Sequence, residues 1–534
     1  MDPGRADLLG GIVMTAEEKK TVEIRVRRQR PDGSGSYVST YKIPVSRGMT
    51  VLDALVSIRE TQDETLTFRY SCRMGICGSC GVIVNGKPLL GCYTQVLDLK
   101  SDSLFVEPLS NLPVIKDLVS DIEPFFDKYK PMKPYLVKPP EAFAQKEEFV
   151  QLPADLNKYW DLSLCIKCSL CYSACPASID ERFPGPTALS TGYRFMADSR
   201  DEGLSERVKS VAENIWLCTS CHSCTISCPK NVDSSTAIVN QRGAVVGEGA
   251  IPKTVQDILT NSYREYNPLG MPESNRANWL QGLPVKDLAT AGKADILYFV
   301  CCLPSYDVRN QELARSMIAT LNSMNADFAV LGNEEWCCGD HILRLGEGGL
   351  FEELAGHNVG LFQKYNINKI VTTSPHCYNT FKNDKPYTDS GITVEHYTQT
   401  LADALEKGKV KLSKKVEKTV AFHDPCFLGK RNKIFEPPRR ILASIPGLKL
   451  IEMKRNLENS FCCGGGAGRV WTEEAPQEKR PCVNRVQEAL EVGAEVIATA
   501  CPFCITTLED GTKVLDVESK IAVRDILELV NEAT

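Results

Sequence analysis

The stretch CIKCSLCYSACP, residues 165–176, places four cysteines and a proline at the spacing C-x2-C-x2-C-x3-C-P. A second run, CTSCHSCTISCP, repeats this spacing at residues 218–229. The spacing is typical of runs that bind cubane [4Fe–4S] clusters, and in paired runs the fourth cysteine binds the cluster of the other run. The two runs therefore predict two cubanes in an α-helical domain over residues 111–250. One ligand set is Cys165, Cys168, Cys171 and Cys228, and the other is Cys218, Cys221, Cys224 and Cys175.

A third cysteine pattern precedes these runs, in SCRMGICGSCGVIVNGKPLLGC at residues 71–92. Its spacing, C-x4-C-x2-C with a further cysteine after eleven residues, is that of a plant-type [2Fe–2S] loop. Zinc sites more often pair two C-x2-C units across a longer loop. Strand-like and helical patterns over residues 20–110 predict a β-grasp ferredoxin-type domain. The predicted ligands are Cys72, Cys77, Cys80 and Cys92.

The [2Fe–2S] loop pattern, then PLSNLPVIKDLVSD at residues 108–121, then the two cysteine runs make residues 20–250 resemble the iron–sulfur subunit of succinate dehydrogenases and fumarate reductases. The resemblance implies an electron path to FAD on a separate flavoprotein subunit. Two features depart from the quinone-linked members. Cys221 occupies a position where they usually lack a cysteine, and CPASIDERFPGP lacks the aromatic residues that help to form their quinone site.

The chain beyond residue 291 is internally repeated. Apolar strand-like segments alternate with helical ones, which predicts parallel α/β sheets. Cys302, the pair Cys337-Cys338 and Cys377 are answered 124, 125 and 127 residues later by Cys426, Cys462-Cys463 and Cys504. Such similar offsets predict two tandem copies of one domain, at residues 291–410 and 411–534, after a linker at residues 251–290.

The second copy resembles the cysteine-rich CCG domain of heterodisulfide reductases. The resemblance implies a noncubane [4Fe–4S] centre, and this copy is predicted to be catalytic. The set comprises Cys426, Cys462, Cys463, Cys501 and Cys504.

The first copy has Ser374 where the second has Cys501. Its remaining four cysteines suit a tetrahedral zinc ion, while the neighbouring Cys301 could replace the missing thiolate. This copy is therefore predicted to be a degenerate site, vacant or loaded with zinc, while Cys301 keeps an iron–sulfur cluster open as an alternative. The four are Cys302, Cys337, Cys338 and Cys377.

Three histidines lie beside the cysteine motifs, His341, His376 and His423. Most histidines in such places pack or form hydrogen bonds, although one could protonate a leaving thiolate near neutral pH. Cys482 has no place in the motif and is predicted to be a small buried apolar residue.

The fusion of these two halves resembles the thiol:fumarate reductases of methanogenic archaea. The resemblance implies that coenzyme M and coenzyme B thiols are oxidised to the heterodisulfide at the C-terminal centre, while a partner flavoprotein reduces fumarate to succinate. One alternative is the iron–sulfur subunit of a succinate or fumarate:quinone oxidoreductase. Another is an electron-transfer subunit without a catalytic site.

Composition is consistent with these interpretations. The 534 residues carry a net charge of −6, which gives no argument for nucleic acid binding. No apolar run reaches the roughly 18 residues of a spanning helix. Residues 1–19 are predicted to be a disordered extension, too short and acidic for a signal peptide, so a cytoplasmic location is expected. The fold class predicted is multidomain, α+β and α/β.

Overall fold

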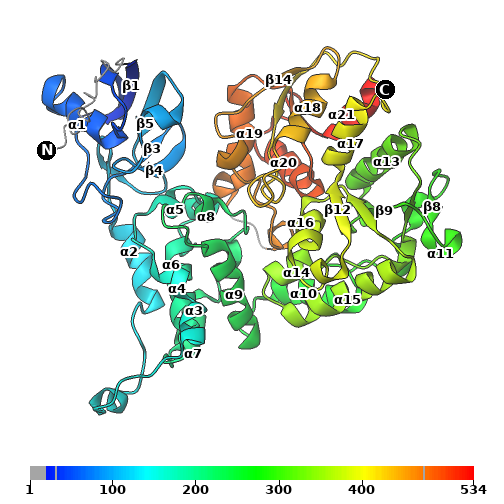
Figure 1. The fold of residues 1–534 in the computed structure, drawn as a ribbon, viewed down its shortest axis with the longest axis horizontal. Coiled ribbons are helices and arrows are strands. Elements are labelled where there is room, and N and C mark those ends of the chain that lie inside the picture. The colour runs from blue at the N-terminus through cyan, green and yellow to red at the C-terminus, as the bar shows by residue number, and fades with distance from the viewer. Residues whose placement is uncertain (1–19, 31–32, 473–475) are drawn as a thin grey trace, which may run out of the picture. The chain divides into compact units, whose positions relative to one another are not determined.

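The computed structural model describes residues 20–30, 33–472 and 476–534, and the extension predicted at residues 1–19 lies outside them. The chain forms two compact units (Figure 1). The first comprises the described residues up to Ile122 together with Ile166–Leu170. The second comprises Glu123–Cys165 and Cys171–Thr534.

A five-stranded mixed sheet and one helix form the core of the first unit. They are β1 Lys20–Gln29, β2 Ser36–Val45, α1 Val51–Thr61, β3 Gly81–Val84, β4 Lys87–Leu90 and β5 Ser103–Glu107, with a separate hairpin of β6 Val114–Lys116 and β7 Val119–Ser120. The strand order is β2–β1–β5–β3–β4. Alternate residues of β1, Val22, Ile24 and Val26, are buried, as expected of a strand with one face on a core. A capping box between Thr50 and Asp53 starts α1.

The two cysteine runs lie in a helical region, and they include the short helices α5 Leu170–Ser173 and α8 Ser223–Ile226. The other helices of this region are α2 Glu123–Tyr129, α3 Pro153–Asn157, α4 Trp160–Ser163, α6 Pro186–Met196, α7 Leu204–Val211 and α9 Ser234–Gly247. The fully buried Arg207 of α7 pairs with Asp201 and donates to the carbonyl oxygens of Met132, Lys133 and Tyr135. This network fixes the loop after α2, because a buried guanidinium is stable only when its donors are satisfied.

Two parallel sheets follow, and they share one topology. The first contains β9 Ile296–Phe299, β10 Phe328–Val330, β11 Lys369–Thr372 and β12 Thr393–His396, with helices α12 Cys302–Tyr306, α13 Val308–Ser323, α14 Asp340–Arg344, α15 Gly348–Lys364, α16 Pro375–Asn383 and α17 Tyr397–Glu406. The second contains β13 Thr419–Phe422, β14 Lys449–Ile451, β15 Val496–Thr499 and β16 Ala522–Asp525, with α18 Glu436–Ser444, α19 Pro481–Glu491, α20 Pro502–Val514 and α21 Ile526–Ala533.

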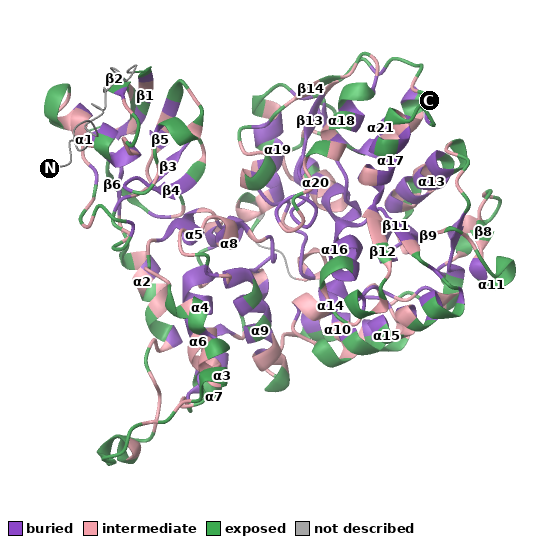
Figure 2. Ribbon diagram, viewed as in Figure 1, coloured by how far each residue is buried: buried purple, intermediate pink, exposed green. Residues whose placement is uncertain are grey.

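The strand orders, β12–β11–β9–β10 and β16–β15–β13–β14, correspond strand for strand. The inner strands are buried, as Figure 2 shows, and a parallel sheet covered by helices on both faces requires this. The predicted α/β fold class is thus confirmed.

Residues 251–290, predicted to be a linker, contain ordered elements. They form α10 Lys253–Glu265, and β8 Lys286–Asp287 extends the first parallel sheet beside β10, before α11 Leu288–Ala291. The polar sequence suggested a linker, but some of its polar residues are buried. Asn267 and Arg276 are 0% and 3% exposed, and each is hydrogen-bonded.

The cysteines of each repeat follow the carboxyl ends of three strands, and in the first repeat Cys337 and Cys338 come after β10. Cys301 and Cys302 follow β9, while Ser374 and Cys377 follow β11. The chain moves from β9 to β10 on one side and returns to β11 on the other, so the strand order reverses between β9 and β11. Ligands bind at such reversal points in open α/β sheets. The second sheet repeats this placement after β13, β14 and β15.

Candidate metal centres

The loop after Tyr70 directs backbone N–H groups at cysteine sulfurs. The N–H groups of Met74, Ile76 and Cys77 lie 3.5, 3.4 and 3.3 Å from Cys72 Sγ. These contacts lower the pKa of the half-buried Cys72 thiol to about 6. Gly75 N–H likewise points at Cys92 Sγ, 3.3 Å away. Donors aimed at sulfur stabilise thiolates, so this loop fits an anionic [2Fe–2S] cluster.

Gly78 allows part of the first cysteine run to approach this loop within the first unit. A Cβ at Gly78 would lie 2.8 Å from both Cα and Cβ of Cys168, and its φ of +77° is unfavourable for other residues. The cluster loop and Cys168 are therefore in close backbone contact.

The second unit gathers the other ferredoxin cysteines in two places. Burial raises the pKa of Cys175 to about 12, with Cys221 and Cys218 as charged neighbours. Cys224 faces Cys175, Cys221 and Cys218. Cys175 thus lies close to cysteines of the second run, and the crossed ligand assignment stays a prediction. Cys228 neighbours Cys165.

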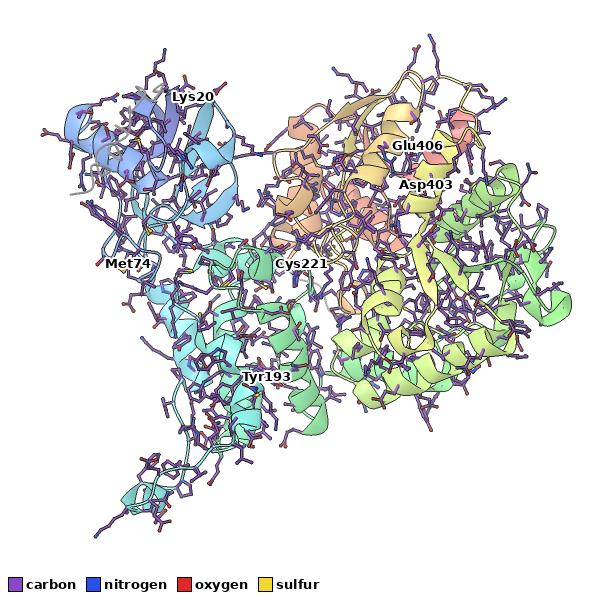
Figure 3. The ribbon with its side chains drawn as sticks, viewed as in Figure 1. Lys20, Met74, Tyr193, Cys221, Asp403 and Glu406 are labelled. Atoms are coloured by element: carbon purple, nitrogen blue, oxygen red, sulfur yellow. The ribbon has the colours of Figure 1, made fainter. Side chains whose placement is uncertain are left out.

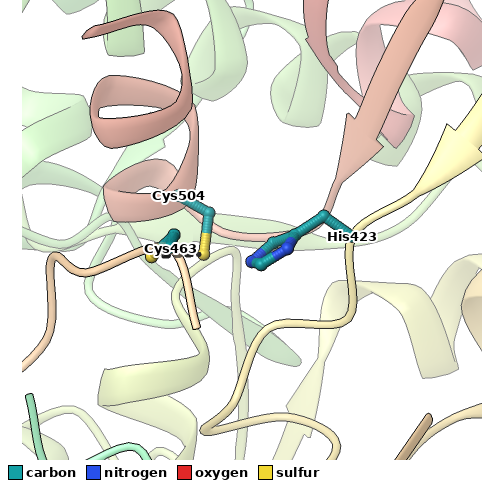
Figure 4. A group of neighbouring side chains, drawn as sticks. All are labelled: His423, Cys463 and Cys504. Atoms are coloured by element: carbon teal, nitrogen blue, oxygen red, sulfur yellow. Dashed lines mark hydrogen bonds between the residues drawn. The ribbon is translucent and has the colours of Figure 1, made fainter. Parts of the chain in front are cut away.

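The C-terminal set, Cys426, Cys462, Cys463, Cys501 and Cys504, forms a continuous buried chain of thiols. Cys426 contacts Cys462, Cys462 contacts Cys463, and Cys504 bridges Cys463 and Cys501. Cys504 Sγ lies 3.5 Å from Cys463 Sγ, with His423 beside them (Figure 4). Five convergent thiols exceed the four donors of a structural zinc ion and fit an iron–sulfur centre.

The second ferredoxin run packs directly against this C-terminal set. Cys221, labelled in Figure 3, is buried with Cys426, Phe427 and Cys462, and its thiol is within hydrogen-bonding reach of Cys462. Thr219 Oγ1 lies 3.6 Å from Cys462 Sγ. The two cysteine sets are therefore neighbours without an intervening layer of side chains.

Basic residues after Cys426 fasten this junction. Lys430 Nζ donates to Ser223 Oγ over 2.6 Å and also to the carbonyl oxygen of Ser460. Arg431 donates to the carbonyl oxygen of Ser220 over 2.9 Å. Both side chains are positively charged and lie close to cysteine thiols that become anionic when they bind metal. Their charge therefore stabilises the metal-bound form of these cysteine sets.

His376 of the first repeat reaches into the C-terminal set. Its Nδ1 lies 2.8 Å from Asp340 Oδ2, and its ring is also hydrogen-bonded to Cys501. Burial lowers the pKa of His376, but Asp340 and Cys501 outweigh burial and raise it to about 10. Burial likewise opposes ionisation of Cys501, while Cys504 and His376 bring its pKa down to about 5. A carboxylate–histidine–thiol chain therefore connects the repeats.

Comparison with known proteins agrees with this organisation. Residues 23–127 match the 2Fe-2S iron-sulfur cluster binding domain, residues 161–232 the 4Fe-4S dicluster domain, and residues 296–382 and 420–509 the cysteine-rich domain. The fumarate reductase iron-sulfur subunit of Mycobacterium tuberculosis is 43% identical, over 41% of this chain and 90% of that protein. A subunit of the Methanosarcina barkeri dihydromethanophenazine:CoB--CoM heterodisulfide reductase is 32% identical, over 70% of this chain and 94% of that protein.

The chain belongs to the iron–sulfur subunit family that joins these two halves. One relative carries both: a subunit of the fumarate reductase (CoM/CoB) of Methanothermobacter marburgensis is 29% identical over 96% of this chain and 99% of that protein. Other relatives are longer, and the chain spans 60% of the Bacillus subtilis probable iron-sulfur-binding oxidoreductase FadF. Members of this joined-subunit family are oxidoreductase subunits, and so is this chain. Among the described residues, no helix is long and apolar enough to cross a membrane.

In this member of the joined-subunit family, the first repeat brings together more thiols than the four predicted. Cys302 contacts Cys337, and Cys338 contacts both Cys337 and Cys377. Cys301 completes the group through its contact with Cys377. Ser374 lies at the start of α16, where its Oγ accepts a hydrogen bond from Cys377 N–H.

A pocket of about 270 Å³ opens beside Cys463. Arg469, Arg480 and Lys513 contribute positive charge to its wall, whereas Asp510 contributes the one carboxylate and pairs with Arg480 at 2.8 Å. Cys482, predicted to be a small buried apolar residue, is 5% exposed and lines this pocket. The pocket thus combines a mostly basic wall with a cysteine of the C-terminal set.

Sequence reasoning missed the residues that support the cysteine sets. Asp340 directly follows the motif Cys337-Cys338-Gly339, so its position was a usable signal. Arg276 and Glu335 offered none, because they are 59 residues apart and meet only in the fold.

Gly466 offers a test of the junction between the second ferredoxin run and the C-terminal set. A Cβ there would lie 2.5 Å from the carbonyl oxygen of Thr219. Because backbone cannot yield as a flexible side chain does, Gly466→Ala should displace the two sets and slow electron transfer between them by about 10-fold or more. Rapid-mixing spectroscopy of cluster reduction measures this. Gly356→Ala, in α15 with open space around its Cβ, should leave the rate unchanged.

Proposed function

We propose that this chain is the iron–sulfur subunit of a thiol:fumarate reductase. In this proposal coenzyme M and coenzyme B thiols are oxidised to their heterodisulfide at the C-terminal set, Cys426, Cys462, Cys463, Cys501 and Cys504. Joining two thiols as a disulfide releases two electrons and two protons. A partner flavoprotein with FAD takes up the same number when it reduces fumarate to succinate.

The observation that carries the proposal is the contact between Cys221 and Cys462. It makes the C-terminal set a neighbour of the second ferredoxin run, so a site of thiol oxidation would adjoin the path to the flavoprotein. The clusters would supply single-electron transfer when bound. The proposed complement is one [2Fe–2S] cluster, two [4Fe–4S] cubanes and a noncubane [4Fe–4S] centre in the C-terminal set. The chain's own role is to hold these sets close together and in order.

The pocket beside Cys463 supports a thiol substrate that bears negative charge. Its basic side chains attract an anion, and its volume of about 270 Å³ admits a small molecule rather than a protein segment. Cys463 lines the pocket. A thiol held there would meet the C-terminal set directly. The many cysteines grouped as thiols, without disulfides among the described residues, also suit a reducing compartment, so we place the chain in the cytoplasm.

The test is an anaerobic assay of the complex with its flavoprotein. Fumarate reduction is expected with both coenzyme thiols together, and little with either thiol alone, because the product contains one of each. A menaquinol analogue should not replace them. Fumarate reduction with the quinol alone would reject the proposal in favour of a quinone-linked subunit.

A further inference from the structure

The first repeat contains five buried thiols, one more than its motif supplies. Cys301, Cys302, Cys337, Cys338 and Cys377 are each at most 4% exposed. Hydrogen-bonding contacts connect them in the order Cys302, Cys337, Cys338, Cys377 and Cys301. This order matches the chain of contacts in the C-terminal set. The repeats therefore present sulfur sets of equal size, although only the second has the complete motif.

Cys301 has a backbone conformation that residues other than glycine rarely adopt. Its φ is 80° and its ψ is 159°. Such strain persists only where the surrounding structure imposes it, and it is concentrated at functional sites. The thiol of Cys301 contacts Cys377. In the second repeat the corresponding cysteine, Cys504, contacts Cys501, and Ser374 occupies the position of Cys501 in the first repeat.

A buried ion pair holds Cys301 in this conformation. Glu335 accepts hydrogen bonds from the N–H groups of Val300 and Cys301, over 2.8 and 3.0 Å. Arg276 pairs with Glu335, and its two terminal nitrogens lie 3.7 and 3.8 Å from Cys302 Sγ. The arrangement fixes the loop and brings positive charge to sulfur.

Ser374 caps a helix in the first repeat. It is fully buried at the start of α16, where its Oγ accepts from Cys377 N–H over 3.5 Å. Its counterpart Cys501 directly precedes α20 and contributes its sulfur to the C-terminal set. Position 374 thus caps a helix, and Cys301 supplies the sulfur from the neighbouring strand end.

We propose that Cys301 is the fifth ligand of a second polynuclear iron–sulfur centre, held in the first repeat with Cys302, Cys337, Cys338 and Cys377. A zinc ion uses four such donors and would leave one buried thiol without a role. Several iron atoms can share five thiolates. Arg276 offsets part of the negative charge that this set acquires on binding metal.

Cys301→Gly tests the proposal without disturbing the backbone, because glycine adopts a φ of 80° without strain. In the full chain purified anaerobically, this variant should lose about four iron atoms and a similar amount of acid-labile sulfide per chain. Adding Ser374→Cys to it should restore both, since the sulfur then returns at the position that Cys501 occupies in the second repeat.

Asn325→Gly is the matched control, since it too places glycine at a positive φ, 52°, in the same repeat. It should leave the metal content unchanged. Unchanged iron in Cys301→Gly would overturn the proposal. So would about one zinc ion per unmodified chain by elemental analysis, an outcome that requires no variant to fold. Both measurements are independent of thiol oxidation, so the proposed function can fail while this inference stands.

Discussion

Replacement of Cys463 by alanine is expected to lower thiol-dependent fumarate reduction by more than about 100-fold. Loss of residues that merely support metal ligands costs about 10–100-fold, and Cys463 is proposed as a ligand itself. It contacts both Cys462 and Cys504 and also lines the pocket, so no other member of the C-terminal set combines these roles. The measurement is fumarate reduction by the complex with both coenzyme thiols.

The same Cys463→Ala preparation provides its own control. A reduced viologen dye delivers electrons to the ferredoxin domains directly, so dye-dependent fumarate reduction should persist. Iron should fall by the content of one centre. Full thiol-dependent turnover would instead identify the chain as an electron-transfer subunit without a catalytic site.

Replacement of His376 should have the next largest effect, about 10–100-fold on thiol-dependent turnover. His376 is positioned by Asp340, which Thr380 and Arg344 hold at 3.0 and 3.2 Å, and it then bonds to Cys501. His376→Leu removes this bond and leaves apolar surface against the sulfur. The midpoint potential of the C-terminal centre, followed by electron paramagnetic resonance, should fall, because a hydrogen bond to sulfur favours the reduced cluster.

His376→Gln separates the bond from mere packing. A glutamine amide places a donor near the position of His376 Nε2, so this variant should recover part of both turnover and potential. Equal losses in the leucine and glutamine variants, or a potential unchanged in either, would show that His376 only fills space between the repeats.

Local sequence predicted much of the fold. The alternation of helices and strands predicted beyond residue 291 includes α13, because Asp307 caps its start and its apolar residues recur at helical spacing. The strands at the centres of the parallel sheets were also predicted, since they are continuous apolar runs. The edge strands β12 and β16 were not, because Thr393–His396 and Ala522–Asp525 mix polar and apolar residues.

The candidate sites divide in the same way. Spacing along the chain identified the cysteine runs, since each loop carries most of its ligands within a few residues. The spacing could not decide the role of Cys301, because a backbone angle and an ion pair between Arg276 and Glu335 orient its thiol. The boundaries proposed for the domains stay predictions.

The position of the cysteine loops beyond the strand ends has a consequence for how the duplicated domains could diverge. A cysteine on one of those loops can be replaced by a cysteine on a neighbouring loop without any change to the packed interior. Substitutions can therefore change the metal site of one repeat while the other repeat and the fold common to both stay the same.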